Sequence, residues 1–121
     1  MLIGTGIDMV RVARVERALS RFGDRFLQRV FTPGERSECL SRSHPAEALA
    51  ARFAAKEACF KALGTGAAPR WREMEVTGRP GERPSMGIRG TMAEKYPRAR
   101  LWVSLAHEGG FAVATVVAEQ P

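Results

Sequence analysis

Apolar residues recur at helical spacing through the middle of the chain. The stretch from Pro45 to Gly64 begins with a residue suited to the first helical position and ends at a typical helix terminator. Small alanines alternate with larger apolar residues and allow neighbouring elements to approach closely. We therefore predict a long core helix, whose large apolar side chains share one stripe: Leu49, Phe53, Phe60 and Leu63.

Before this helix, residues 2–8 alternate loosely between apolar and small side chains. This pattern predicts a first strand that ends at Asp8. Gly4 and Gly6 within it indicate close approach by another segment or by a ligand. They do not form a dinucleotide fingerprint, because the third glycine and the helix that it should open are missing, so a Rossmann domain is not expected.

The region between the first strand and the long helix is predicted to be helical. From Val10 the apolar period becomes that of an amphipathic helix, and a second short helix follows that Asp24 could cap. The run from Thr32 to Glu35 matches a capping box and predicts a third short helix through about Leu40.

The C-terminal half alternates like strands. Residues 73–77 and 85–89 flank a turn-rich connection, residues 91–96 form a short helical segment, and residues 101–105 and 111–117 flank a Gly-Gly turn. We expect one α+β domain over residues 1–121, with the long alanine-rich helix packed on a mainly antiparallel sheet.

The composition adds a basic charge and no sign of export. The net charge is +6, and 16 of the 19 basic residues are arginine, which indicates an acidic partner: a nucleic acid, a phosphorylated cofactor or an acidic protein. No apolar run approaches the length needed to span a bilayer, and the N-terminus lacks a signal-peptide pattern. Two cysteines outside any Cys-x-x-Cys pair suggest a reducing, cytoplasmic setting.

Arginines concentrate on the first two predicted helices. Only Glu16 and Asp24 interrupt them, so the run is either a solvated helix surface or a docking face. The six arginines are Arg11, Arg14, Arg17, Arg21, Arg25 and Arg29.

Two places in the sequence are candidates for chemistry. Glu57 leaves the long helix beside its apolar stripe, with Lys61 four residues later. The pair is either an ordinary surface ion pair or a metal-binding carboxylate with a phosphate-binding lysine. His107, after a predicted strand, forms no hydrolase triad with Ser104 or Glu108.

Taken together, three blocks resemble a known family. These are Asp8 at the end of the first strand, Arg52–Ala58 with Lys61–Gly66 on the long helix, and Val103–His107 late in the chain. In these blocks the chain is similar to the holo-[acyl-carrier-protein] synthases, the small bacterial type of 4'-phosphopantetheinyl transferase. The resemblance covers nearly the whole chain.

The resemblance implies an activity and a catalytic centre. These enzymes transfer the 4'-phosphopantetheine arm of coenzyme A to a serine of apo acyl carrier protein in fatty acid biosynthesis, releasing adenosine 3',5'-bisphosphate. By analogy Asp8 and Glu57 would hold Mg²⁺, and Lys61 would contact the pyrophosphate. The base stays open between Glu57, acting through a water on the metal, and a group on the carrier protein. His107 would belong both to the catalytic residues and to the residues that line the coenzyme A site. The other residues lining the coenzyme A site would be Arg52, Lys61, Gly64, Thr65, Gly66, Arg83 and Pro84.

The resemblance also implies partners. Acyl carrier proteins are acidic along one helix, and family members of this length are trimers with active sites between subunits. We therefore expect a homotrimer whose C-terminal strands pack against a neighbour. The arginines that match the carrier-protein docking positions are Arg14, Arg21, Arg25 and Arg29.

Two other functions are compatible with parts of the sequence. A basic nucleic-acid-binding module would explain the charge, but the aromatic residues do not interleave with the arginines and no zinc finger is present. A non-catalytic binder of coenzyme A or carrier protein is disfavoured because Asp8, Glu57 and Lys61 are all intact. We expect neither a nucleic acid nor a membrane as partner.

Overall fold

A computed structural model describes residues 1–64 and 68–121 and contains a five-stranded sheet, ordered β1-β5-β4-β3-β2. Every neighbouring pair of strands is antiparallel. β1 and β5 come from opposite ends of the chain and pair over most of their length. The strands are β1 (Leu2–Arg11), β2 (Met74–Thr77), β3 (Ser85–Ile88), β4 (Arg100–Glu108) and β5 (Phe111–Glu119).

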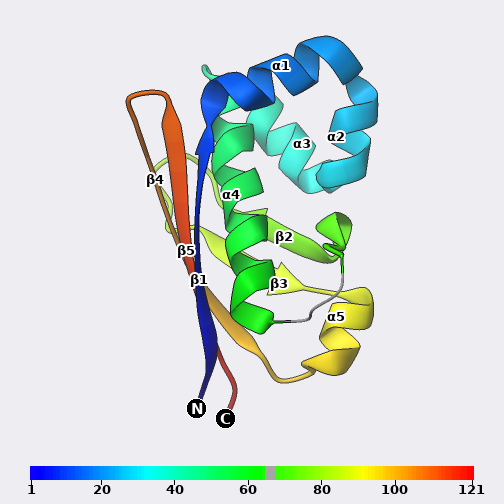
Figure 1. The fold of residues 1–121 in the computed structure, drawn as a ribbon, viewed down its shortest axis with the longest axis vertical. Coiled ribbons are helices and arrows are strands. Elements are labelled where there is room, and N and C mark those ends of the chain that lie inside the picture. Colours follow the sequence, from blue (N-terminus) through cyan, green and yellow to red (C-terminus); the bar gives the residue numbers. More distant parts are fainter. Residues whose placement is uncertain (65–67) are drawn as a thin grey trace.

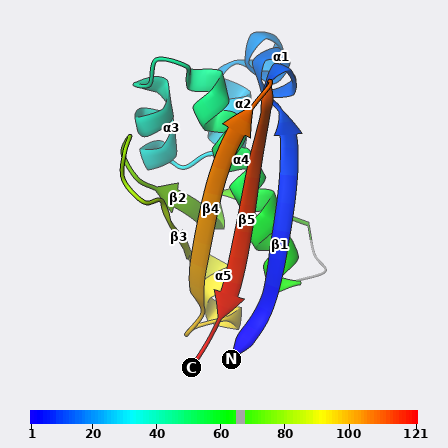
Figure 2. The same cartoon turned by 90° about the vertical axis from the view of Figure 1, so that its left-hand side faces the viewer.

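The helices gather on one side of β1, β5 and β4, with the longest helix lying along them (Figure 1). Seen from the other side, these three strands have no helix in front of them (Figure 2). Within the two described ranges, none of the helices combines the length and apolarity needed to cross a membrane. They are α1 (Val12–Phe22), α2 (Asp24–Val30), α3 (Pro33–Leu40), α4 (Pro45–Leu63), the single 3-10 turn η1 (Trp71–Glu73) and α5 (Gly90–Lys95).

The predicted α+β class and the long core helix are confirmed. Gly64 ends α4 in the left-handed conformation, with φ of 59°, and donates its N–H to the carbonyl of Phe60. The capping box of α3 is also present, because Thr32 and Glu35 exchange side-chain and backbone hydrogen bonds.

Several predicted details were wrong. β1 does not end at Asp8 but continues to Arg11, because pairing with β5 extends to Phe111. β4 likewise runs to Glu108, which places His107 inside the strand, opposite Ala112. Asp24 does not cap α2: Gly23 occupies the cap position, and no side-chain cap hydrogen bond forms there.

Glycines let α4 lie directly on β1, as Gly4 and Gly6 suggested. A Cβ atom built on Gly6 would lie 1.9 Å from the carbonyl oxygen of Ala58, and one on Gly4 would lie 2.2 Å from that of Ala62. Both distances are far inside van der Waals contact. The helix backbone therefore touches the strand backbone, and the side chains that β1 and α4 contribute beside this contact are brought together.

We predict that Gly6→Ala lowers the free energy of unfolding by about 1–3 kcal/mol or more, the typical cost of overpacking, because the new methyl group meets a backbone atom. Gly87→Ala is the matched control, since a Cβ at this strand glycine meets nothing within 4 Å. Urea denaturation of both variants measures the difference. Equal stability of the two variants would contradict the proposed contact.

Candidate active site

Asp8 and Lys61 meet where β1 passes under the last turns of α4. The Lys61 ammonium lies 3.3 Å from Oδ1 of Asp8 and donates a 3.0 Å hydrogen bond to the carbonyl of Ile7. The Asp8 side chain is 18% exposed and the Lys61 side chain 51% exposed. The Asp8 carboxylate is thus mostly buried, whereas the Lys61 ammonium group remains accessible to a ligand.

Glu57, one turn before Lys61 on α4, completes this group. Burial raises the pKa of the Glu57 carboxyl, and the negative charge of Asp8 raises it further. Lys61 and Arg14 of α1 oppose this pKa shift with their positive charges. The predicted trio of Asp8, Glu57 and Lys61 is therefore one electrostatically coupled group, with Arg14 at its edge.

The repulsion between Asp8 and Glu57 is the feature that fits a cation. A carboxyl group whose pKa is raised by a neighbouring carboxylate, as that of Glu57 is, also favours a divalent cation, and Mg²⁺ is commonly held by one or two carboxylates together with substrate phosphates. Within the part of the chain that the structure describes, no cluster of three or more His, Cys, Asp or Glu residues could hold a metal. The donor set thus suits Mg²⁺ with substrate oxygens better than an all-protein metal cage.

His107 lies in a second cluster with Arg52. Its Nδ1 is 3.1 Å from Oε1 of Glu47, and both residues line a cavity of about 270 Å³ beside the start of α4. Arg52 is buried and donates to the carbonyl of Gly78, but its Nε–H is buried without a hydrogen-bond partner. The ionisable residues that line this cavity are Arg42, His44, Glu47, Arg52 and His107.

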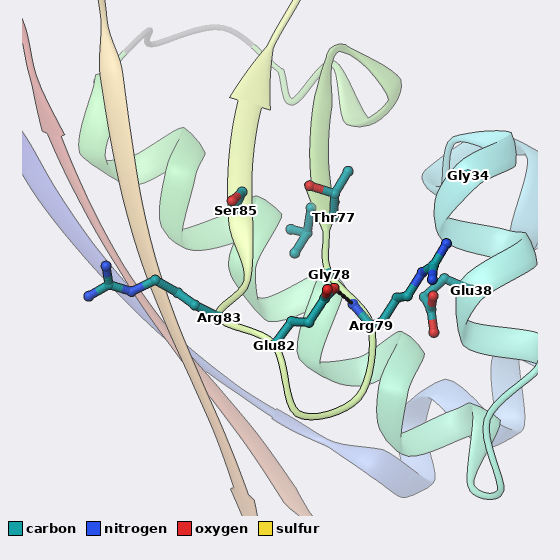
Figure 3. A pocket seen from close by; sticks show the side chains of 9 residues that line it. Gly34, Glu38, Thr77, Gly78, Arg79, Glu82, Arg83 and Ser85 are labelled. Atoms are coloured by element: carbon teal, nitrogen blue, oxygen red, sulfur yellow. Dashed lines mark hydrogen bonds between the residues drawn. The ribbon is translucent and has the colours of Figure 1, made fainter.

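Arg83 and Pro84 lie in a third place, on the connection between β2 and β3. Arg83 points away from α3 toward β4, where its guanidinium lies 6.0 Å from the ring centre of Trp102 (Figure 3). On the other side of this connection lies a cleft of about 510 Å³, which is lined by Arg79 of the connection itself and by Glu38 of α3 (Figure 3). Thr65 and Gly66, which were also expected in the coenzyme A site, lie outside the described residues, whereas Gly64 ends α4.

The predicted docking arginines are all exposed, on α1 and α2. Arg25 and Arg29 border a cavity of about 410 Å³, which we call the α2 pocket. Its remaining lining is apolar: Phe22, Phe26, Val30 and Trp71. This part of the face therefore offers an apolar recess with two positive charges at its edge.

Sequence reasoning missed several residues of these clusters. His44 was given no role, yet it shares a cavity with His107, and Arg42 and Trp71 were not singled out. No local spacing could identify them, because they reach their clusters through turns. Lys56 was visible as a charged residue among alanines, which is a signal of a buried, partnered side chain.

The chain is similar to known proteins over nearly its whole length. A family model described as the 4'-phosphopantetheinyl transferase superfamily matches residues 4–116. A holo-[acyl-carrier-protein] synthase from Methylobacterium sp. (strain 4-46) is 47% identical, covering 98% of this chain and 95% of that protein.

Solved structures agree with this similarity. The holo-[acyl-carrier-protein] synthase of Neisseria meningitidis matches with a TM-score of 0.86 and 34% identity, covering 99% of this chain and 100% of that one. The synthase of Helicobacter pylori, solved in complex with coenzyme A, matches with a TM-score of 0.84 and 32% identity, covering 95% and 99%.

Proposed function

Because the chain belongs to the 4'-phosphopantetheinyl transferase superfamily, and within it to the holo-[acyl-carrier-protein] synthases, we propose that Asp8, Glu57 and Lys61 form its catalytic centre. The enzyme transfers the 4'-phosphopantetheine moiety of coenzyme A to a serine of apo acyl carrier protein. The observation that carries the assignment of the centre is the coupling of the two carboxylates and Lys61 at the contact of β1 with α4.

In the reaction, the serine oxygen forms a bond to the phosphorus that carries the pantetheine arm. The bond from that phosphorus to the bridging oxygen breaks, adenosine 3',5'-bisphosphate leaves, and the serine hydroxyl gives up its proton. Asp8 and Glu57 would hold Mg²⁺, which when bound would neutralise the charge of the pyrophosphate. Lys61, half exposed beside Asp8, would donate to a phosphate oxygen and stabilise negative charge as it develops.

The enzyme's cysteines take no part in this transfer. Burial raises the pKa of the Cys59 thiol to about 12 and that of Cys39 to about 11, so neither is a thiolate at neutral pH. Neither cysteine is therefore suited to carry the arm as a thiolate nucleophile. Two free, buried cysteines also agree with the proposed cytoplasmic location.

We assign the remaining coenzyme A contacts to the other two clusters. Arg42 and Arg52 bring two positive charges to the cavity that His107 and Glu47 also line, and these charges would suit a phosphate of the nucleotide. Arg83 and Pro84 line a surface recess with Trp102 on the strand face. The proposed coenzyme A-binding residues also include Lys61 and, after it in the sequence, Gly64, Thr65 and Gly66.

The helix-free face of the sheet supports the proposed homotrimer. Ile7, Met9 and Trp102 are 61%, 62% and 45% exposed, and the strand register places them on neighbouring rows with Val113 and Val117. Exposed apolar surface of this kind is typical of an interface. A second copy of the chain is the occupant that we propose, because Arg83 and Pro84 open onto this face and a neighbour could complete the coenzyme A site.

The carrier protein would dock on α1 and α2. Arg14, Arg21, Arg25 and Arg29 face solvent, and the α2 pocket offers an apolar recess between the last two of them and Trp71. Arg14 acts on Glu57 electrostatically, so the arginine face continues to the catalytic centre. A carrier protein bound there would present its serine near Glu57.

The reaction and its metal requirement are tested together by intact mass spectrometry. Apo acyl carrier protein incubated with the enzyme, coenzyme A and Mg²⁺ should gain the mass of one phosphopantetheine arm, and EDTA should abolish the gain. Glu57→Gln should lose at least about 99% of the activity, since it removes one charged ligand. The control is Glu94→Gln, at an exposed position of α5, which should behave as wild type. Normal turnover by Glu57→Gln would refute the metal assignment.

Charge reversal tests the docking face. Arg14→Glu with Arg21→Glu should reduce kcat/KM for the carrier protein far more at 20 mM salt than at 500 mM, because salt screens charges on exposed surfaces. Lys95→Glu with Arg98→Glu makes the same charge change in and after α5, at the opposite end of the molecule from α1 (Figure 1), and should have a small effect. A loss that is independent of salt would count against docking at this face.

Measuring the oligomeric state tests whether the helix-free face of the sheet is the interface between subunits. Thr115 is exposed between Ile7 and Ser104 in the strand register, so Thr115→Arg would bury a charge in the proposed interface. Light scattering should show wild-type trimers and Thr115→Arg monomers of about 13.3 kDa. Glu94→Arg, on α5, should remain trimeric. Wild-type monomers with full activity would exclude a site shared between subunits.

A further inference from the structure

Lys56 is a fully buried lysine on α4 whose ammonium group uses all three of its donors. It lies 2.5 Å from Oε1 of Glu35, and both side chains are 0% exposed. It also donates 2.7 Å to the carbonyl of Val30 and 2.9 Å to the carbonyl of Trp71. Lys56 thus joins α4 to α3, to the end of α2 and to η1.

Glu35 is equally well satisfied. Its Oε1 accepts from the N–H of Thr32, and its Oε2 accepts from the N–H of Val76. Buried ion pairs can often be replaced by apolar residues without loss of stability, so stability alone is a weak reason for this one. What an apolar side chain could not supply is three directed contacts from one point of α4.

Two of these contacts end on the walls of the α2 pocket. Val30 and Trp71, whose carbonyls accept from Lys56, both line the pocket. The ring of Trp71 also stacks on Phe53, one helical turn before Glu57, with 5.1 Å between ring centres. Lys56 therefore binds the backbone of two residues that line the α2 pocket. Its neighbour in the sequence is Glu57, so the same part of α4 carries both the anchor of the pocket and the carboxylate.

We propose that Lys56 is a positioning residue that fixes the α2 pocket relative to the carboxylate of Glu57. The inference rests on the proposed function, in which the pocket receives the carrier protein and Glu57 belongs to the catalytic centre. If the pocket walls move relative to α4, the docked serine moves relative to the reacting phosphorus. A misplacement of about 1 Å can cost about 100-fold in rate.

The test compares variants that differ only in the contacts of Lys56 to the pocket. Glu35→Gln removes the ionic partner and leaves both carbonyl contacts, so it should lower the melting temperature but keep kcat and KM within about twofold. Adding Lys56→Met removes the carbonyl contacts as well. We expect kcat/KM for the carrier protein to fall about 10- to 100-fold, through lower kcat and higher KM, while KM for coenzyme A changes little.

A control separates positioning from stability. Leu49 is fully buried on the same helix, and Leu49→Ala should lower the melting temperature without changing either kinetic constant below that temperature. If it loses as much activity as the double variant, or if the double variant keeps the kinetics of Glu35→Gln, the inference is overturned. Failure of the wild type to load any carrier protein would instead refute the proposed function.

A measurement on the wild type decides the question if the double variant does not fold. The chain has three lysines, Lys56, Lys61 and Lys95, so selective ¹⁵N labelling gives three side-chain signals. Lys56 is fully buried, and a docked partner cannot touch it. Apo carrier protein should shift the Lys56 signal through the pocket walls and leave Lys95 unchanged. An unmoved Lys56 signal at saturating carrier protein would overturn the inference.

Discussion

The close contact between α4 and β1 is the constraint on which the proposed catalytic centre depends. Any side chain at position 4 or 6 would push the helix away from the strand, because the carbonyls of Ala58 and Ala62 occupy that space. Two glycines on the strand and alanines on the helix remove the side chains that normally separate such elements. Asp8 and Lys61, which protrude beside this contact, then meet without long loops to carry them. Rigid secondary structure positions catalytic groups more accurately than loops do.

A second constraint fixes the other side of the helix. Glu35 caps its own helix through Thr32 and at the same time accepts from Lys56 and Val76, so a local capping motif also serves as a tertiary anchor. Burial lowers the pKa of Lys56, and the adjacent carboxylate opposes this by favouring the charged form. Because every donor of the ammonium is used, the desolvation cost is offset by directed bonds that an apolar core would lack. The helix is thus held by its backbone on one side and by one charged side chain on the other.

The parts of this structure that follow from local patterns were predictable from the sequence. The α4 ends, the α3 capping box and the hairpin turn at Gly109 and Gly110 each have a chemical signature within a few residues. Strand ends had none, because the lengths of β1 and β4 are set by pairing with β5, which lies at the far end of the chain. Asp8, Glu57 and Lys61 could be proposed through motifs, whereas the cavity of His44 and His107 and the α2 pocket depend on turns that bring distant segments together.

The distribution of charge links the catalytic centre to its surroundings. Glu57 experiences Asp8 as a repulsive neighbour and Lys61 and Arg14 as attractive ones, so its protonation reflects groups on β1, α4 and α1 together. An acidic partner that approaches Arg14 would weaken one of the positive charges that lower the pKa of Glu57, whereas a cation between the carboxylates would lower that pKa further. In the proposed function, docking and metal binding would therefore act on the carboxyl group of Glu57 with opposite sign. The net charge of +6 favours the approach of both an acidic protein and a phosphate-bearing substrate. The two carboxylates are a local negative exception, and in the proposed function Mg²⁺ would offset their repulsion of the substrate phosphates.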